Sequence, residues 1–418
     1  MARAANINPE ILVWARESAG MSLEDAASRL GLSSSETNSA AEKLAEFEAG
    51  KKFPTRNQLA KFATVYRRPL ITFYMKERPE QGARGEDFRI LPGTVSTRQN
   101  AMLDALLRDI RARQEMVKSL LEDEEETAPR EYVGSATIKG GVQAAVNSIA
   151  QTLGFDVNAR RSGTSEDLFK ELRNRAEQIG VFVILVGDLG SHHSSISETV
   201  FRGFAIADNI APFVVINDQD AKSARSFTLL HELAHIWLGQ TGVSGGAPES
   251  IVPATAVGKI EQFCNDVAGE FLLPSSAFRV KPQGLNGGNK EKALPIVQSF
   301  ADTWNVSEPM VAYRLNRLGW IVPAVYRELT ADYAARWYAT KLEAKDKGKE
   351  SEGGPSYYVV KQFKLGNALV DVVRRTLRNN ELTHTKAAKV LGVRPSSVEP
   401  LVRRLEHSRG ALIPDFRR

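Results

Sequence analysis

The segment FTLLHELAHIWLG, from Phe227 to Gly239, carries two histidines four residues apart with a glutamate between them. On a helix, positions four apart lie about 40° apart around the axis and about 6 Å along it, so His231 and His235 can bind one cation. Glu232 directly follows His231 and can face a metal-bound water, which is the placement that a general base needs. The pattern predicts Zn2+ binding by the two histidines and proton transfer by Glu232.

A catalytic zinc site takes three protein ligands and leaves a fourth position open. The segment KIEQFCNDVAGEFLLP is predicted to form a second helix, because its apolar residues recur at four-residue spacing before a proline ends it. That spacing places Glu261 beside the buried stripe, so we expect Glu261 to be the third ligand, with Glu270 as the alternative. Asp266 is either an acceptor for a histidine N–H or a solvated residue. Cys264 is either a small core residue or a redox-sensitive neighbour of the metal.

The alternative for the histidine segment is a buried helix in which the histidines only pack. Its apolar residues give the helix one face to bury and leave both histidines on another, and Gly239 stands where the helix would end. This arrangement favours the metal site. The other histidines carry less information: His192 and His193 lie in a polar loop that we expect to be exposed, and His384 and His407 belong to a basic C-terminal region.

Composition limits the kinds of protein and of metal site that remain. A chain of 418 residues is expected to form about two to four domains. Its single cysteine excludes a disulfide framework and a cysteine-rich zinc module, so a metal must be bound by histidine and carboxylate. No apolar run approaches the roughly 20 residues of a membrane span, and the first residues lack the apolar segment of a signal peptide. We therefore expect a cytoplasmic protein without a membrane partner.

Residues 9 to 78 have the pattern of a compact set of short helices. Asn8 before Pro9 predicts the start of a first helix, and Ser22 and Gly31 bracket a second one. Two short helices joined by a tight turn predict a helix-turn-helix. The third helix region is rich in glutamate, whereas a helix that reads the major groove presents arginine, lysine, asparagine or glutamine. DNA binding and protein interaction therefore both remain open for this module.

The middle of the chain predicts a small sheet within a mostly helical α+β fold. Two helices precede the apolar strand VFVILV, and VFRGFAIAD and PFVVIN predict two more strands ahead of the histidine-containing helix. We expect the strand FRGFAIAD to lie at a sheet edge, where an extended substrate could pair with it. The expected divisions are residues 1–80 (helix-turn-helix domain), 81–130 (connector and long helix), 131–280 (metal-binding domain), 281–340 (helix-turn-helix-like segment), 341–357 (mobile linker) and 358–418 (basic helical domain).

The C-terminal region concentrates positive charge. Residues 361 to 418 contain 13 lysines and arginines against 5 acidic residues, a net charge of +8 in a chain whose total is +5. Neutralisation of phosphates by such residues supplies most non-specific affinity for nucleic acid. The segments 383–391 and 396–405 also mimic the helix pair near the N-terminus. We expect any DNA affinity to depend more on this region than on the acidic third helix, with a solvated or protein-docking surface as the alternative.

Together these motifs resemble one family, the ImmA/IrrE-type zinc metallopeptidases, in the long form that carries an N-terminal XRE-family helix-turn-helix domain. The resemblance runs from about residue 9 to 405 and includes EAGKKFPTRNQLAKFATVYRRPLITFY, DFRILPG, FTLLHELAHIWLG, EQFCNDVAGEFLLP and FADTWNVSEPMVAYRLNRLG. It implies a zincin-like peptidase domain in which His231, His235 and Glu261 bind Zn2+ and Glu232 is the catalytic base.

The resemblance also implies an activity and partners. Such a chain is expected to be a zinc-dependent endopeptidase that cleaves a helix-turn-helix transcriptional repressor and so switches on stress-response or mobile-element genes. Its protein substrate would be an XRE-type repressor. DNA is the other expected partner. Tyr313 and Arg314 are candidates for stabilising the oxyanion. The alternative is a DNA-binding regulator or antitoxin-like protein whose zincin domain acts as a sensor or scaffold. The oligomeric state stays open, a dimer being one alternative.

Overall fold

The computed structural model describes most of the chain. The described residues are 7–35, 38–79, 86–87, 96–123, 128–159, 163–190, 194–245, 255–278, 281, 285, 287–350 and 356–410. The chain forms two compact units, made of residues 1–84, 92–110 and 188–196 in the first and of residues 85–91, 111–187 and 197–418 in the second. Within the described ranges, no helix has the length and apolar composition that crossing a membrane requires.

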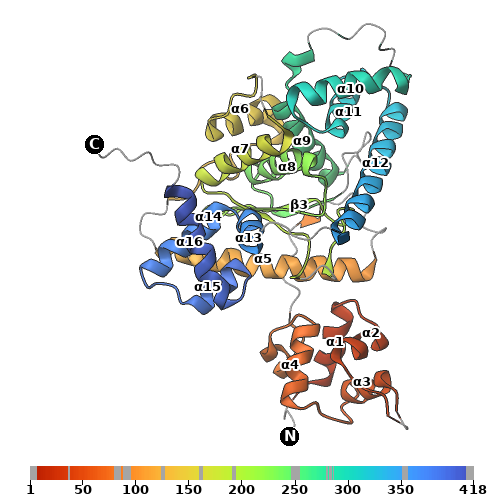
Figure 1. Cartoon of the computed structure of the whole chain (residues 1–418), viewed down its shortest axis with the longest axis vertical. Helices are drawn as coiled ribbons and strands as arrows, with labels where there is room; N and C mark the ends of the chain where they lie inside the picture. Colours follow the sequence, from red (N-terminus) through yellow and green to blue (C-terminus); the bar gives the residue numbers. More distant parts are fainter. Residues whose placement is uncertain are drawn as a thin grey trace. The chain divides into compact units, whose positions relative to one another are not determined.

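The first unit contains a bundle of short helices. They are α1 (Pro9–Ser18), α2 (Leu23–Leu30), α3 (Ala40–Glu48), α4 (Arg56–Val65) and the 3-10 helix η1 (Leu70–Tyr74) (Figure 1). The predicted start of the first helix at Pro9 and the predicted end of the second at Gly31 are both confirmed. Gly31 adopts a left-handed φ of 69°, which ends α2 without the strain that a side chain would bring.

The glutamates of α3 are engaged within this bundle. Glu42 completes a capping box at the start of α3. Glu48 accepts two hydrogen bonds from Arg16 of α1, at 2.8 and 3.0 Å, and Glu46 pairs with Lys52 at 2.7 Å. The acidic character of this helix therefore has local structural causes, and Glu48 is the carboxylate that joins α3 to α1.

The second unit is built on a sheet that, among the described residues, has five strands in the order β1-β5-β3-β4-β2. They are β1 (Glu86–Asp87), β2 (Phe182–Leu185), β3 (Gly203–Ile206), β4 (Phe213–Ile216) and β5 (Gly242–Ser244). β2 is parallel to β4, β1 is parallel to β5, and β3 is antiparallel to both of its neighbours. The three apolar strands predicted from the sequence are present, whereas β1 and β5 are too short to show a pattern.

β3 is an interior strand, so the prediction that FRGFAIAD lies at a sheet edge is wrong. Phe204 pairs with Val215 of β4 on one side and with Val243 of β5 on the other. Neighbouring strands thus occupy both hydrogen-bonding sides of β3, and an extended peptide cannot add there.

Helices pack on the sheet and form the main core. They include η3 (Ile138–Gly140), α6 (Val142–Leu153), α7 (Ser165–Gln178), η5 (Lys222–Ala224), α8 (Arg225–Trp237), α9 (Ala256–Leu272), η6 (Ser275–Phe278), α10 (Lys290–Trp304) and α11 (Glu308–Arg317). α8 contacts β3 and β4 and packs along α9, with α6 against both helices (Figure 1). The long helix α5 (Thr97–Asp123) contributes residues to both units. The architecture is the expected α+β class, mostly helical.

A long helix, α12 (Pro323–Glu350), occupies part of the expected mobile linker. Residues 341–350 of that linker belong to the helix, and residues 351–355 lie outside the described residues. Tyr338 and Lys341 both bond to the buried carboxylate of Glu198, at 2.6 and 3.3 Å. These long-range contacts fix α12 at the point where the expected linker begins, in a stretch whose polar composition indicates a free chain.

The C-terminal helices pack on the sheet domain. They are α13 (Tyr357–Leu365), α14 (Asn367–Arg378), α15 (His384–Leu391), the 3-10 helix η7 (Pro395–Ser397) and α16 (Val398–Gly410). α13 contacts β2, and α14 contacts α7 and β2. The boundary expected at residue 358 is therefore crossed by packing contacts, and both sides belong to the second unit.

Candidate metal centre

The helix α8 is buried along nearly its whole length. Its apolar side chains, including Leu229, Leu233 and Trp237, have essentially no exposed surface. The indole of Trp237 stacks on Tyr132 with ring centroids 4.5 Å apart. The helix ends as predicted, because Gly239 follows with a left-handed φ of 70°. This packing fixes the position of the polar side chains that α8 carries.

Three predicted ligands converge where α8 meets α9. The Nε2 atoms of His231 and His235 lie 3.1 Å apart. One oxygen of Glu261 lies 3.0 Å from His235 Nε2, and the other lies 3.5 Å from His231 Nε2. All three side chains are buried, and the three ligand atoms lie within 4.8 Å of one another. Among the described residues, this is the one group of three such side chains close enough to hold a metal.

This donor set fits a zinc ion. A tetrahedral ion at about 2.0–2.2 Å from its ligands sets those ligands about 3.3 Å apart, and the three separations above are close to that value. Burial raises the pKa of Glu261, but the two histidines outweigh that effect and hold it at about 2. Glu261 is therefore a charged carboxylate aimed at two imidazole nitrogens. Zn2+ bound by these residues would lower the pKa of a bound water and polarise a substrate carbonyl.

Glu232 lies beside this cluster and is completely buried. Neither of its carboxylate oxygens has a well-formed hydrogen bond. Burial, helped by the negative charge of Glu261, raises the pKa of Glu232 to about 8 against the opposing effect of His231. An unsatisfied buried carboxylate is costly and points to a partner that completes it, such as a metal-bound water.

Gly203 of β3 gives Glu232 its space. A Cβ atom at position 203 would lie 2.6 Å from Oε1 of Glu232 and 2.9 Å from a methyl carbon of Thr228. Both distances are shorter than a normal contact, so any larger residue must displace the carboxylate. The sequence marks Gly203 only as a strand glycine, whose meaning depends on the helix that packs against it.

We expect Gly203→Ala to lower the rate of any reaction that uses Glu232 about a hundredfold while zinc content stays unchanged, because a displacement of about 1 Å can have that effect on a catalytic group. Gly288→Ala is the matched control, since a Cβ atom there meets nothing within 4 Å. Metal analysis and cleavage rates of both variants check the prediction. Equal activity of the two variants would contradict it.

Ser244 is a site residue that the sequence did not reveal. Its Oγ lies 3.2 Å from His231 Nε2 and 3.4 Å from His235 Nε2, on the last residue of β5. The hydroxyl thus borders the position that a fourth ligand would take. Because β5 has three residues and no pattern of its own, only the pairing with β3 brings Ser244 here.

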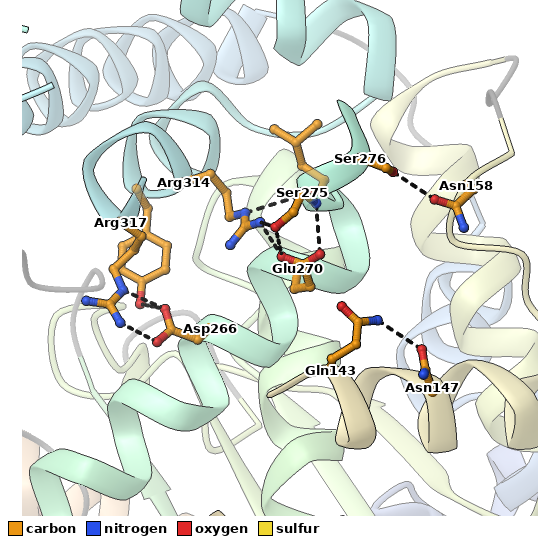
Figure 2. Close-up of polar contacts among 11 residues, drawn as sticks. Gln143, Asn147, Asn158, Asp266, Glu270, Ser275, Ser276, Arg314 and Arg317 are labelled. Carbon is orange, nitrogen blue, oxygen red and sulfur yellow. Dashed lines mark hydrogen bonds and ion pairs between the residues drawn. The ribbon is translucent and has the colours of Figure 1, made fainter. Parts of the chain in front are cut away.

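The other polar residues considered from the sequence have structural partners. Figure 2 shows that Asp266 receives two hydrogen bonds from Arg317, at 2.8 and 2.7 Å, and it also accepts one from the hydroxyl of Tyr313 at 2.8 Å. Asp266 is therefore neither a histidine acceptor nor a solvated residue. The hydroxyl of Tyr313 is likewise engaged away from the cluster.

Glu270 and Arg314 form a second internal group. The Arg314 guanidinium donates to Glu270, to the carbonyl of Leu273 and to Ser275, whose backbone N–H also donates to Glu270 (Figure 2). This group closes the turn after α9 onto α11. Glu270 is thus fully engaged there, and Glu261 is the carboxylate that reaches the histidines.

Cys264 is a buried core residue, and burial raises the pKa of its thiol. His384 is 61% exposed and lies 3.7 Å from Glu399. His192 and His193 lie outside the described residues, so their expected exposure stays a prediction.

We expect one zinc ion per chain, and we expect Glu261→Ala to lower zinc affinity by at least about a hundredfold, because only two protein ligands remain. Glu166→Gln is the matched control, since its carboxylate is partly exposed and pairs with Lys222 away from the histidines. Metal analysis after dialysis against a weak chelator measures the effect. Full zinc retention by the Glu261 variant would contradict the ligand assignment.

The fold and the site together define a buried group of two histidines and a glutamate, able to hold a metal, beside a mixed sheet. Residues 176–316 match the family model described as IrrE N-terminal-like domain, Peptidase_M78. The match supports an ImmA/IrrE-type peptidase domain from the end of α7 to the end of α11, and it includes all three predicted ligands. No curated protein and no solved structure matches the chain.

Proposed function

We propose that this chain is a zinc-dependent endopeptidase that cleaves a helix-turn-helix transcriptional repressor and thereby switches on stress-response or mobile-element genes. The observation that carries the proposal is the buried group of His231, His235 and Glu261 beside an unsatisfied Glu232. In this proposal the three ligands hold Zn2+, and Glu232 takes a proton from the attacking water and returns it to the leaving amine.

The match to a peptidase family supports the reaction class. The different environments of the two buried carboxyl groups support the assignment of Glu261 as a metal ligand and of Glu232 as the base. The two histidines lower the pKa of Glu261, whereas burial raises that of Glu232, so the two carboxyl groups have different environments.

The experiment is co-expression of the full chain with an XRE-type repressor encoded beside it, followed by intact mass measurement of the repressor. Cleavage by the wild type, with an uncut repressor in the presence of Glu232→Gln, supports the proposal. An uncut repressor in both cases would favour a second function, as a DNA-binding regulator with a sensor or scaffold role for the zinc domain.

One feature of the structure favours that second function. The C-terminal helices pack directly on β2 and α7, so a nucleic-acid contact in that region would be mechanically joined to the metal-binding domain. A regulator of this kind would tolerate loss of the Glu232 carboxylate, whereas a peptidase would not. If the Glu232→Gln variant regulates a DNA target as strongly as the wild type does, the regulator function is favoured over the peptidase function.

A further inference from the structure

Two helix pairs far apart in the sequence share one internal pattern. A serine or threonine caps the first helix, two buried alanines and a buried leucine follow, and a glycine with left-handed φ ends the helix. In α2 these residues are Ser22, Ala26, Ala27, Leu30 and Gly31, and in α15 they are Thr383, Ala387, Ala388, Leu391 and Gly392. The spacing from the cap to each residue is identical in the two helices.

The backbone of the turn is also the same. The N–H of Leu32 donates to the carbonyl of Ala27 at 3.0 Å, and the N–H of Val393 donates to that of Ala388 at 2.9 Å. In the C-terminal pair, residues 392–394 make the turn and η7 runs directly into α16. A three-residue turn that contains glycine between two packed helices is the geometry of a helix-turn-helix.

The C-terminal pair has the core that this geometry needs. Val398 and Leu401 of α16 are fully buried, and α14, α15 and α16 contact one another pairwise. The pair therefore belongs to a small three-helix unit that presents its outer surface independently of the metal centre.

The two pairs differ in the charge of their first helix. The exposed charged residues of α2 are Glu24, Asp25 and Arg29, whereas α15 exposes Lys386 and Lys389 and no acidic residue. The turn and the described part of α16 add exposed Arg394, Arg403 and Arg404 against one exposed acidic residue, Glu399, which pairs with Arg403 at 2.8 Å. The same helix-turn-helix pattern thus begins with an acidic helix, α2, near the N-terminus and with a basic helix, α15, near the C-terminus.

We propose that the α15–turn–α16 unit binds duplex DNA. The first helix of such a pair crosses the phosphate backbone, which assigns Lys386 and Lys389 to phosphates. The beginning of the second helix enters the major groove, where Arg394 on the turn meets the base edges. The proposal is independent of peptidase activity, because none of these residues lies in the metal centre.

The test uses the full chain and a labelled duplex of about three helical turns and arbitrary sequence, at about 50 and about 200 mM KCl. We expect Lys386→Glu combined with Lys389→Glu to weaken binding at least about tenfold at the lower salt and to reduce the salt slope by about two. Lys292→Glu combined with Arg327→Glu is the matched control, since both residues are exposed and the charge change is the same. The control is expected to stay within about twofold of wild type.

Lys386 and Lys389 are exposed, so we expect their substitution to leave the fold intact. Zinc content and thermal unfolding of both double variants check this. Equal loss of affinity in both double variants would overturn the proposal, because DNA affinity would then depend on the net charge of the chain and not on the α15 lysines. Unchanged affinity in the α15 variant would also overturn it. Tighter binding of a single-stranded RNA of the same length, dependent on the same lysines, would assign the surface to a different ligand.

Discussion

Glutamine in place of Glu232 is expected to lower the proposed cleavage of a repressor by at least about a thousandfold, with the fold and the zinc content unchanged. The amide has the shape of the carboxylate but cannot accept a proton from a metal-bound water, and general base catalysis of this kind contributes about 10²–10⁴ in rate. Because Glu232 is fully buried and its oxygens lack well-formed hydrogen bonds, an amide of the same size fits its place and removes only the group that exchanges a proton.

The matched control is Glu166→Gln, which changes a partly exposed carboxylate that pairs with Lys222 on the surface of the same unit. Cleavage rates, zinc content and thermal unfolding are measured for both variants. A cleavage rate of the Glu232→Gln variant equal to that of the wild type would show that Glu232 is not the catalytic base. Loss of zinc together with activity would instead make Glu232 a structural residue of the centre.

The local parts of the metal centre were predictable because they depend on spacing within helices. The apolar residues of α8 and α9 recur at helical intervals, and that periodicity favours Glu261 as the third ligand while keeping Glu270 as the alternative. The structure places Glu261 against both histidines and Glu270 in an ion pair with Arg314. Residues four apart on one helix meet regardless of the rest of the fold, so sequence reasoning can reach them.

The remaining parts depend on contacts between distant segments. Ser244 reaches the centre through the pairing of β5 with β3, and Gly203 matters because its strand packs against Glu232. The same holds for β3, which sequence placed at a sheet edge although β5 covers its free side. Polar composition likewise indicates a linker at 341–357, whereas α12 continues to Glu350 and Lys341 bonds to Glu198 and to the carbonyl of Gln219.

A buried ion pair lies at the junction between the metal-binding domain and the C-terminal helices, beside the packing of α13 and α14 on β2 and α7. Arg173 of α7 bonds to Glu177 at 3.0 Å and also donates to carbonyl groups of β2 and α13. Glu177 accepts the N–H of Asn367, at 3.0 Å, from the start of α14. Burial lowers the pKa of Arg173 and raises that of Glu177, against their mutual attraction. The charged forms of Arg173 and Glu177 are therefore favoured at this buried position only while both side chains are present.

Loss of one partner is expected to loosen this junction. Arg173→Ala leaves the carboxylate of Glu177 buried and unpaired, a change that costs about 3–5 kcal/mol of unfolding free energy. We expect the urea midpoint to fall and hydrogen exchange in α13 and α14 to accelerate. Lys170→Ala, on the same helix, is the control: its pair with Asp167 is more than half exposed and contributes less than about 1 kcal/mol.

A second variant separates the loss of charge balance from a general defect in packing. Arg173→Met combined with Glu177→Leu removes both charges and fills the space with apolar atoms, but it leaves the carbonyl groups of β2 and α13 and the N–H of Asn367 without their partners. It is therefore expected to recover only part of the stability that Arg173→Ala loses. Urea unfolding of the three variants and the wild type measures this order. An Arg173→Ala variant within about 1 kcal/mol of wild type would show that the pair does not hold the junction. Slow exchange in α13 and α14 of that variant would show the same.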